Sequence, residues 1–248
     1  MGSSRRYRLD LAYRGSAYHG WQRQPNALSV QEVLEGRLGQ LLRAPIELTG
    51  CGRTDTGVHA LRYVAHFDGP EGLTAWPKDG LVRSLNGMLP SDIVVYSLAE
   101  VAADFHARFD ARLREYRYVL QRRPNPFTLG LATPYYHELS LEAMQRGAQA
   151  LLDHEDFASF CKSGGDAKTT ICRLARSEWA VEGDQWVYTV AADRFLRNMV
   201  RAIVGTLLEM GRGRITLGEL HDILRAKSRS RAGASVSPEG LYLSRVEY

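Results

Sequence analysis

A single carboxylate stands in a glycine-rich stretch of the chain, Gly50–Ala60. Asp55 follows Arg53 by two residues, and Thr54 and Thr56 flank it with hydroxyl groups. A cation within about 4–6 Å favours the ionised form of a carboxyl group, so Arg53 can keep Asp55 charged. Glycines allow backbone angles closed to other residues and let a ligand approach the main chain. The pattern fits an acid that acts on a ligand, or the ordinary turn that most Asp residues beside Gly and Thr form.

Two further groups of side chains suit the binding of an aromatic, anionic ligand. Tyr116 and Tyr118 are two residues apart in a predicted strand, so both rings are expected on one face of a sheet. They either fill the core or offer an aromatic surface to an unstacked base. Arg194, Arg197 and Arg201 have the i, i+3, i+7 spacing of one helical stripe. Such a stripe is either a solvated basic face or a binding surface.

Other polar residues have two interpretations each. His59 enters a predicted strand, where a histidine is usually structural and only rarely a general base. Trp21–Gln24 is a polar and aromatic loop that could face RNA. A serine-interleaved basic segment is either solvated charge or a set of contacts to a phosphate backbone, and its members are Arg225, Lys227, Arg229 and Arg231.

Composition sets limits on the class of protein. The 248 residues suit one large domain or two small ones, and the formal charge of +4 weakly favours a polyanionic partner. Three cysteines without paired spacing indicate neither a disulfide framework nor a zinc site. Phosphate-binding loops, H-E-x-x-H pairs and dinucleotide fingerprints are absent from the sequence. Apolar runs fall short of the roughly 20 residues that cross a bilayer, and no signal segment follows the first residues, so we expect a cytoplasmic protein.

Hydrophobic periodicity predicts the elements that position these residues. In the first half it predicts the order β-α-β-β-α-β of a split βαβ, ferredoxin-like unit. Ser29 and Glu32 are predicted to cap its first helix. The predicted strands of this half are 7–13, 45–49, 61–67 and 93–97, with helices over 30–42 and around 81–85.

The second half repeats this pattern loosely. Its predicted strands are 115–121, 171–181, 185–192 and 241–248, and its helices are 141–152, 195–210 and 217–225. We predict an α+β fold of two ferredoxin-like halves with antiparallel sheets, forming one pseudo-symmetric body around a central cleft. Residues 1–105 are the half that carries the Asp55 turn, and residues 106–248 complete the cleft.

Six segments together resemble one enzyme family. They are Tyr18–Gln24, Gly52–His59, Asp104–Phe109, Arg114–Tyr118, Asn198–Gly205 and Glu239–Leu243. In this order they are similar to the signature segments of the tRNA pseudouridine synthase A family. The resemblance extends from about Tyr7 to Tyr248.

The resemblance implies an isomerase that converts uridine to pseudouridine on the 3′ side of the anticodon stem and loop of tRNA, without cofactor or metal. It implies that Asp55 is the catalytic nucleophile, that Arg201 is its ion-pair partner, and that Tyr116 stacks on the target uracil. Arg53 either orients Asp55 or helps to extrude the target base. A homodimer that holds one tRNA is also implied.

The sequence leaves several alternatives open. An RNA-binding protein without turnover would use the same sheets, and a nucleoside hydrolase would let water take the sugar. For a synthase, Asp55 can attack the sugar, attack uracil C6, or remove the 2′ proton. His106 and Arg108 lie in a segment that carries the resemblance, with no role that the residues themselves indicate.

Overall fold

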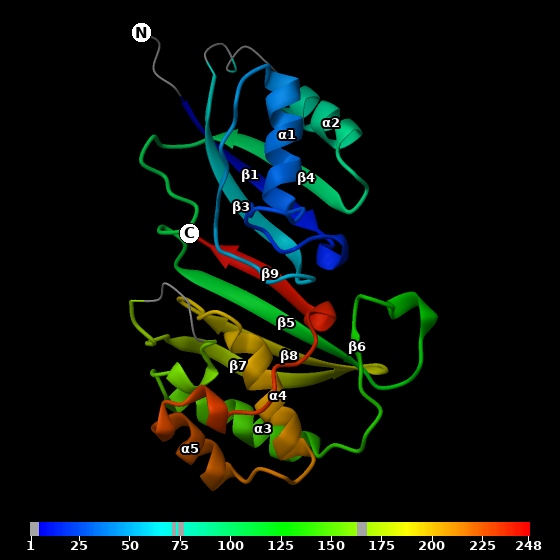
Figure 1. The fold of residues 1–248 in the computed structure, drawn as a ribbon, viewed down its shortest axis with the longest axis vertical. Coiled ribbons are helices and arrows are strands. Elements are labelled where there is room, and N and C mark those ends of the chain that lie inside the picture. Colours follow the sequence, from blue (N-terminus) through cyan, green and yellow to red (C-terminus); the bar gives the residue numbers. More distant parts are fainter. Residues whose placement is uncertain (1–4, 71–72, 74–76, 163–167) are drawn as a thin grey trace. The chain divides into compact units, whose positions relative to one another are not determined.

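The chain forms two compact units (Figure 1), described here from a computed structural model that covers residues 5–70, 73, 77–162 and 168–248. Unit 1 extends to Arg112 and includes Leu243–Tyr248, and unit 2 is Leu113–Tyr242. The last strand, β9 (Leu241–Glu247), therefore belongs mostly to unit 1, although it was predicted with the second half.

Unit 1 contains an antiparallel sheet. Strand β1 (Arg5–Tyr13) lies between β4 (Ile93–Glu100) and β3 (His59–Gly69), and the short β2 (Thr49–Gly50) pairs with β3. Every second residue of β1 from Tyr7 is buried, which is the alternation of a strand with one face on a core. This confirms the strand predicted at 7–13.

Two helices of unit 1 begin and pack as their sequences predict. The hydroxyl of Ser29 accepts a hydrogen bond from the Glu32 amide at 3.2 Å, so α1 (Val30–Leu42) has the predicted N-cap. Leu34 and Leu38 bury its apolar face. The second helix, α2 (Lys78–Met88), contacts α1 and β4 and buries its own apolar stripe. The element order β-α-β-β-α-β of this unit is the predicted one.

Unit 2 is also mostly antiparallel. Strand β8 (Gln185–Ala192) lies between β5 (Leu113–Gln121) and β7 (Leu174–Glu182), while the short β6 (Thr133–Pro134) runs parallel to β5. Helix α3 (Leu141–Ala150) contacts β7 and two further helices, α4 (Met199–Gly211) and α5 (Leu217–Ala226). The mixed α/β class with antiparallel pairing is confirmed, and the internal pseudo-symmetry stays a prediction.

Short 3-10 turns connect these elements. They are Gly15–Ala17, Pro126–Thr128, Leu151–Asp153, Ala158–Phe160, Arg229–Arg231 and Pro238–Gly240. Within the described ranges, no helix has the length and apolar character needed to cross a membrane.

Two predicted elements had wrong bounds. The strand predicted at 45–49 is reduced to β2, because the Leu48 amide donates to the side chain of Glu35 at 2.9 Å instead of to a neighbouring strand. The helix predicted from 195 begins at Met199, because Asn198 has a left-handed φ of 65°. Arg194 and Arg197 therefore precede α4 and do not share a helical stripe with Arg201, since the i, i+3 spacing holds only within a helix.

Candidate active site

The Asp55 turn, residues 51–58 of unit 1, connects β2 to β3. The Val58 amide donates to the Asp55 carbonyl at 3.1 Å and closes a β-turn. Gly57 is the third residue of that turn and has a φ of 78°, a conformation that favours glycine there. The side chain of Asp55 is half-buried and that of Arg53 is exposed, so the turn presents both near the surface of the unit.

A second segment, residues 13–21, crosses this turn and is called the clasp here. The Trp21 amide donates to the Thr54 carbonyl at 3.4 Å, and the Gly57 amide donates to the Tyr18 carbonyl at 3.2 Å. The backbones meet so closely that a Cβ atom on Gly20 would lie 2.2 Å from the Thr54 oxygen. A Cβ atom on Gly15 would lie 2.0 Å from the Val58 oxygen. Only glycine fits at these two positions of the clasp.

Buried aromatic side chains support the turn from below. The hydroxyls of Tyr13 and Thr54 share a hydrogen bond of 2.9 Å, and the Tyr63 hydroxyl donates to the Gly52 carbonyl. The Tyr63 ring stacks on Trp21 with centroids 4.1 Å apart. Trp21 is only 3% exposed, so the expectation that it faces RNA was wrong, whereas residues 22–24 of that loop are exposed. The indole fills the space beneath the turn instead.

His59 has the structural role that was the commoner expectation. Its side chain is buried, and its Nδ1 atom accepts a hydrogen bond from the Gly15 amide at 2.9 Å. A ring nitrogen that accepts a buried backbone amide is not available to take a proton from a substrate. His59 therefore joins β3 to the clasp.

In unit 2, the two tyrosines of β5 have separate environments. Tyr118 is fully buried, and its hydroxyl bonds the Thr133 hydroxyl at 2.7 Å and donates to the Ser237 carbonyl at 2.8 Å. Burial raises the pKa of Tyr118 above its ordinary value. Tyr116 is half-buried, and the ring of Phe195 meets it edge-on with centroids 5.0 Å apart. Of the two expectations for these tyrosines, core packing is confirmed for Tyr118. Phe195 was missed because the run around it was assigned to a helix face.

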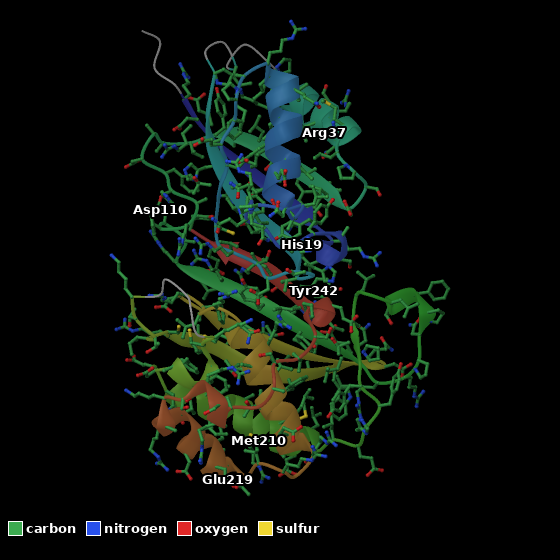
Figure 2. The ribbon with its side chains drawn as sticks, in the orientation of Figure 1. His19, Arg37, Asp110, Met210, Glu219 and Tyr242 are labelled. Atoms are coloured by element: carbon green, nitrogen blue, oxygen red, sulfur yellow. The ribbon has the colours of Figure 1, made fainter. Side chains whose placement is uncertain are left out.

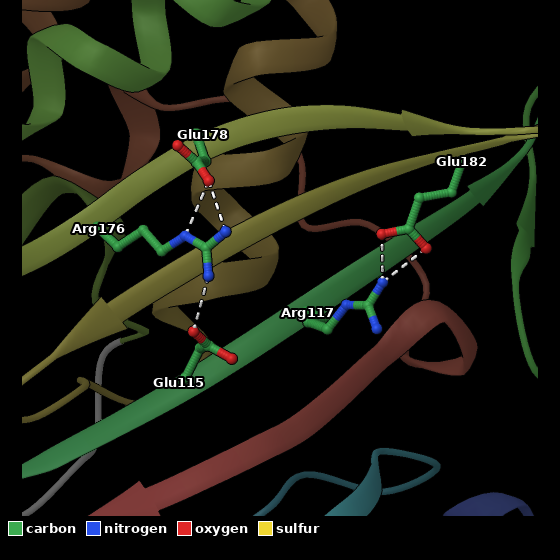
Figure 3. A network of polar contacts seen from close by, with 5 residues as sticks. All are labelled: Glu115, Arg117, Arg176, Glu178 and Glu182. Carbon is green, nitrogen blue, oxygen red and sulfur yellow. Dashed lines mark hydrogen bonds and ion pairs between the residues drawn. The ribbon is translucent and has the colours of Figure 1, made fainter.

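Strands β5 and β7 carry a charged network on the face of the sheet opposite to Tyr116 and Tyr118 (Figure 3). Arg176 of β7 donates to Glu178 at 2.9 Å and to Glu115 at 3.1 Å, and Arg117 bonds Glu182 at 2.6 Å. Glu115 and Arg117 flank Tyr116 in sequence, so its ring points to the other side of β5. The arginines of this network are matched by carboxylates, which disfavours this face as a phosphate-binding surface.

Arg201 is the third residue of α4 and is half-buried. Its Nε donates to the Val236 carbonyl at 2.7 Å, and its own carbonyl accepts the Val236 amide at 3.2 Å. Val236 belongs to residues 232–238, called the strap here, which cross α4. The Gly233 amide donates to the Thr206 hydroxyl at 2.9 Å. A Cβ atom on Gly205 would lie 1.8 Å from the Ala234 oxygen, so the strap and the helix meet backbone to backbone.

Most of the basic segment at the end of α5 and directly after it is engaged within unit 2. Lys227 Nζ lies 2.7 Å from a carboxylate oxygen of Asp156, and Arg225 pairs with Asp222. Arg229 donates to the Ser235 hydroxyl of the strap at 2.9 Å. These three cations therefore serve local structure.

The predicted site residues are thus distributed over both units. Arg53 and Asp55 share one turn of unit 1, and Tyr116 and Arg201 belong to unit 2. The pairing of Arg201 with Asp55 stays a prediction. Among the described residues, His, Cys, Asp and Glu side chains form no group of three or more that could hold a metal ion.

Comparison with known proteins identifies the family. The family model described as tRNA pseudouridine synthase matches residues 11–110 and 148–248. Proteins described as tRNA pseudouridine synthase A are similar over nearly full length. That of Parabacteroides distasonis is 46% identical over 247 residues, covering 98% of this chain and 96% of its own. That of Porphyromonas gingivalis is 46% identical over 245 residues, covering 98% and 97%. That of Acetivibrio thermocellus is 41% identical over 246 residues, covering 98% and 100%. The chain belongs to the tRNA pseudouridine synthase family, whose members are isomerases that convert uridine to pseudouridine in tRNA.

Proposed function

We propose that this enzyme isomerises uridines of the anticodon stem-loop of tRNA and that Asp55 is the catalytic residue. The observation that supports Asp55 is its position on a turn that the clasp fixes through two backbone hydrogen bonds and two glycine contacts. Catalytic groups need a supporting structure that holds them within a fraction of an ångström. The half-buried carboxylate has that support and stays near the surface of unit 1.

The reaction breaks the bond from C1′ to N1, turns the uracil, and forms a bond from C1′ to C5. C5 then loses a proton and N1 gains one, so the product is an isomer of the substrate. It involves no redox change and loses no group, so the chemistry calls for no nicotinamide, nucleotide or metal. Attack on the sugar, attack on uracil C6 and removal of the 2′ proton are the three possible first steps. Each of them requires an ionised carboxylate, which is the function proposed for Asp55.

The resemblance supports the roles proposed for three other residues. Tyr116 stacks on the extruded uracil, since a base taken from its helix needs an aromatic surface. Arg201 supplies the positive charge that favours the ionised form of Asp55. Arg53, exposed on the catalytic turn, extrudes the target base or orients the acid. A homodimer that holds one tRNA is proposed on the resemblance alone.

The experiment uses tRNA that carries tritium on uridine C5. Isomerisation releases the tritium to water, so Asp55→Asn is expected to lower the rate by on the order of 10³-fold or more. Binding of tRNA should stay within about twofold, because the amide keeps the shape of the turn. The matched control is Asp184→Asn, an acid beside Gly183 between β7 and β8, which should keep full activity.

Two outcomes would contradict the proposal. Loss of tRNA binding with residual tritium release would make Asp55 a recognition residue. Release of free uracil in place of pseudouridine would make the chemistry a hydrolysis.

A further inference from the structure

The segment from Asp104 to Asp110 forms a tight turn on unit 1, here called the Phe109 turn. The His106 amide donates to the Asp110 carboxylate at 2.8 Å, and the Asp110 amide donates to the His106 carbonyl at 3.0 Å. Nδ1 of His106 accepts the amides of Arg108 and Phe109 at 3.2 and 3.3 Å. The turn is therefore closed by its own side chains. Asp110, at its end, is labelled in Figure 2.

The same turn is anchored to the core of unit 1. The buried Ala107 donates its amide to Nδ1 of His66 at 3.1 Å, and its carbonyl accepts the Tyr248 hydroxyl at 2.7 Å. Arg6 donates to the Phe105 carbonyl at 3.0 Å. Burial, with the nearby charge of Arg6, lowers the pKa of His66 to about 4, so its ring is neutral at neutral pH and keeps this acceptor. The backbone of the turn is thus tied to unit 1 at Phe105 and Ala107.

This fixed turn exposes a large aromatic side chain. Phe109 is 75% exposed, although burying such a side chain stabilises a protein by about 1.5–3 kcal/mol. Its ring lies against the His106 ring, with centroids 4.3 Å apart and planes 32° apart. The Arg108 guanidinium lies 5.7 Å from the Phe109 centroid. The rings of Phe109 and His106 and the guanidinium of Arg108 therefore lie close together on a turn whose backbone is held in place.

The chemistry of this group favours a nucleobase over a protein surface. Aromatic, imidazole and guanidinium planes are the groups on which proteins stack unpaired bases. A protein interface normally buries about 1,200–2,000 Å². Of residues 101–112, all of which are described, Phe109 is the one large apolar side chain that is exposed. A single ring between the charged residues Arg108 and Asp110 is too small an apolar area for such an interface.

We propose that the Phe109 turn is a second RNA-binding site, on which an unpaired base of the tRNA stacks against Phe109. This rests on tRNA being the substrate, and the remoteness of the site from the reacting uridine rests on Asp55 being the catalytic residue. His66 lies seven residues beyond His59 along β3, about 23 Å at roughly 3.3 Å per residue. The stacked base is therefore not the uridine that reacts at Asp55 but a nucleotide several positions away.

The test measures tRNA binding in the Asp55→Asn background, so that turnover plays no part. Adding Phe109→Ala should raise the Kd for tRNA about 5- to 100-fold, the range expected for loss of one stacked base. Phe109→Tyr should restore binding to within about twofold, because the ring is kept. The matched control is Phe127→Ala, which removes a phenylalanine that is 89% exposed in unit 2 and should leave the Kd unchanged.

A second variant reports stacking directly. The fluorescence of Phe109→Trp, after subtraction of the four native tryptophans, should be quenched by tRNA with the same Kd as binding. Absence of quenching, or an unchanged Kd in Phe109→Ala, would overturn the proposal. A lower assembly mass by light scattering in Phe109→Ala, with tRNA affinity retained, would instead make the turn a contact between protein chains. A large fall in kcat at saturating tRNA, measured for Phe109→Ala in a chain that keeps Asp55, would also contradict the proposal. A base contact remote from the reaction affects KM and not kcat.

Discussion

The Asp55 turn of unit 1 and the Arg201 end of α4 in unit 2 are supported by the same kind of contact. In each, a segment distant in sequence crosses at a glycine and meets backbone directly, the clasp at Gly20 and the strap at Gly205. The two differ in what is held. The clasp bonds the backbone of Thr54 and Gly57, on either side of Asp55, whereas the strap accepts a hydrogen bond from the guanidinium of Arg201 itself.

This difference predicts different consequences of damage. The strap also bonds Thr206 and runs across a helix whose residues are almost all buried, so loosening it exposes the core of unit 2. The clasp packs on the Asp55 turn near the surface of unit 1, so it affects mainly the position of the Asp55 carboxylate. We therefore expect changes at the strap to lower stability first and changes at the clasp to lower activity first.

The largest effect is expected for Gly205→Ala. Its Cβ would lie 1.8 Å from the carbonyl oxygen of Ala234, a backbone atom that cannot turn aside as the end of a flexible side chain could. Overpacking of this kind costs about 3 kcal/mol or more. Thermal denaturation followed by circular dichroism should show a Tm lower by roughly 6–12 °C, at 2–4 °C per kcal/mol for a chain of this size.

Gly87→Ala is the control for that change. Gly87 lies in α2, and a Cβ atom there would meet nothing within 4 Å. Alanine is favoured over glycine in a helix by up to about 1 kcal/mol, so the Tm should stay or rise slightly. Equal melting temperatures for the two variants would show that the strap is not fixed on α4.

Local signals in the sequence were enough to predict much of unit 1. The cap at Ser29 and the alternation along β1 depend on residues a few positions apart, and both appear as predicted. The glycine-rich turn around Asp55 was also evident. The reason for Gly15 and Gly20 was not, because the backbone that excludes a side chain there belongs to residues more than 30 positions later.

In unit 2, too, local sequence patterns did not predict the structure around a proposed site residue. Periodicity correctly predicted a helix in this region but placed its start at residue 195. The left-handed backbone of a single residue, Asn198, sets the start of α4 instead. The strap has no regular hydrophobic periodicity, so the sequence did not predict its hydrogen bond with Arg201. The functions assigned to Asp55, Arg201 and Tyr116 came from family resemblance, since spacing alone left each of them an ordinary alternative.

A smaller loss of stability but a clear loss of activity is expected for Gly20→Ala. The φ of 87° disfavours alanine by roughly 1–2 kcal/mol, and the Cβ would lie 2.2 Å from the Thr54 oxygen. Relief of that contact must move the turn by about 1 Å, and a displacement of this size typically costs roughly 100-fold in rate. Tritium release should therefore fall by about that factor while the chain stays folded.

Gly183→Ala separates backbone strain from the contact. Gly183 has a φ of 62° in the turn between β7 and β8, and a Cβ there would meet nothing within 4 Å. Gly183→Ala should lose a similar amount of stability from the positive φ, with normal tritium release. If Gly183→Ala lost as much activity as Gly20→Ala, backbone strain at a positive φ would explain both losses, and displacement of the Asp55 carboxylate would not.

The smallest effect is expected for the hydroxyl pair beneath the turn. Tyr13→Phe removes a partner from the buried hydroxyl of Thr54, which is expected to cost about 1 kcal/mol of stability. Thr54→Val removes the other hydroxyl, and the double variant should be less destabilised than the sum of the two by about 1 kcal/mol. Urea denaturation of all four chains measures this coupling. Additive losses would mean that the hydrogen bond does not hold the residue before Asp55. The clasp would then support the Asp55 turn through backbone contacts alone, and tritium release should fall far less in Tyr13→Phe than in Gly20→Ala.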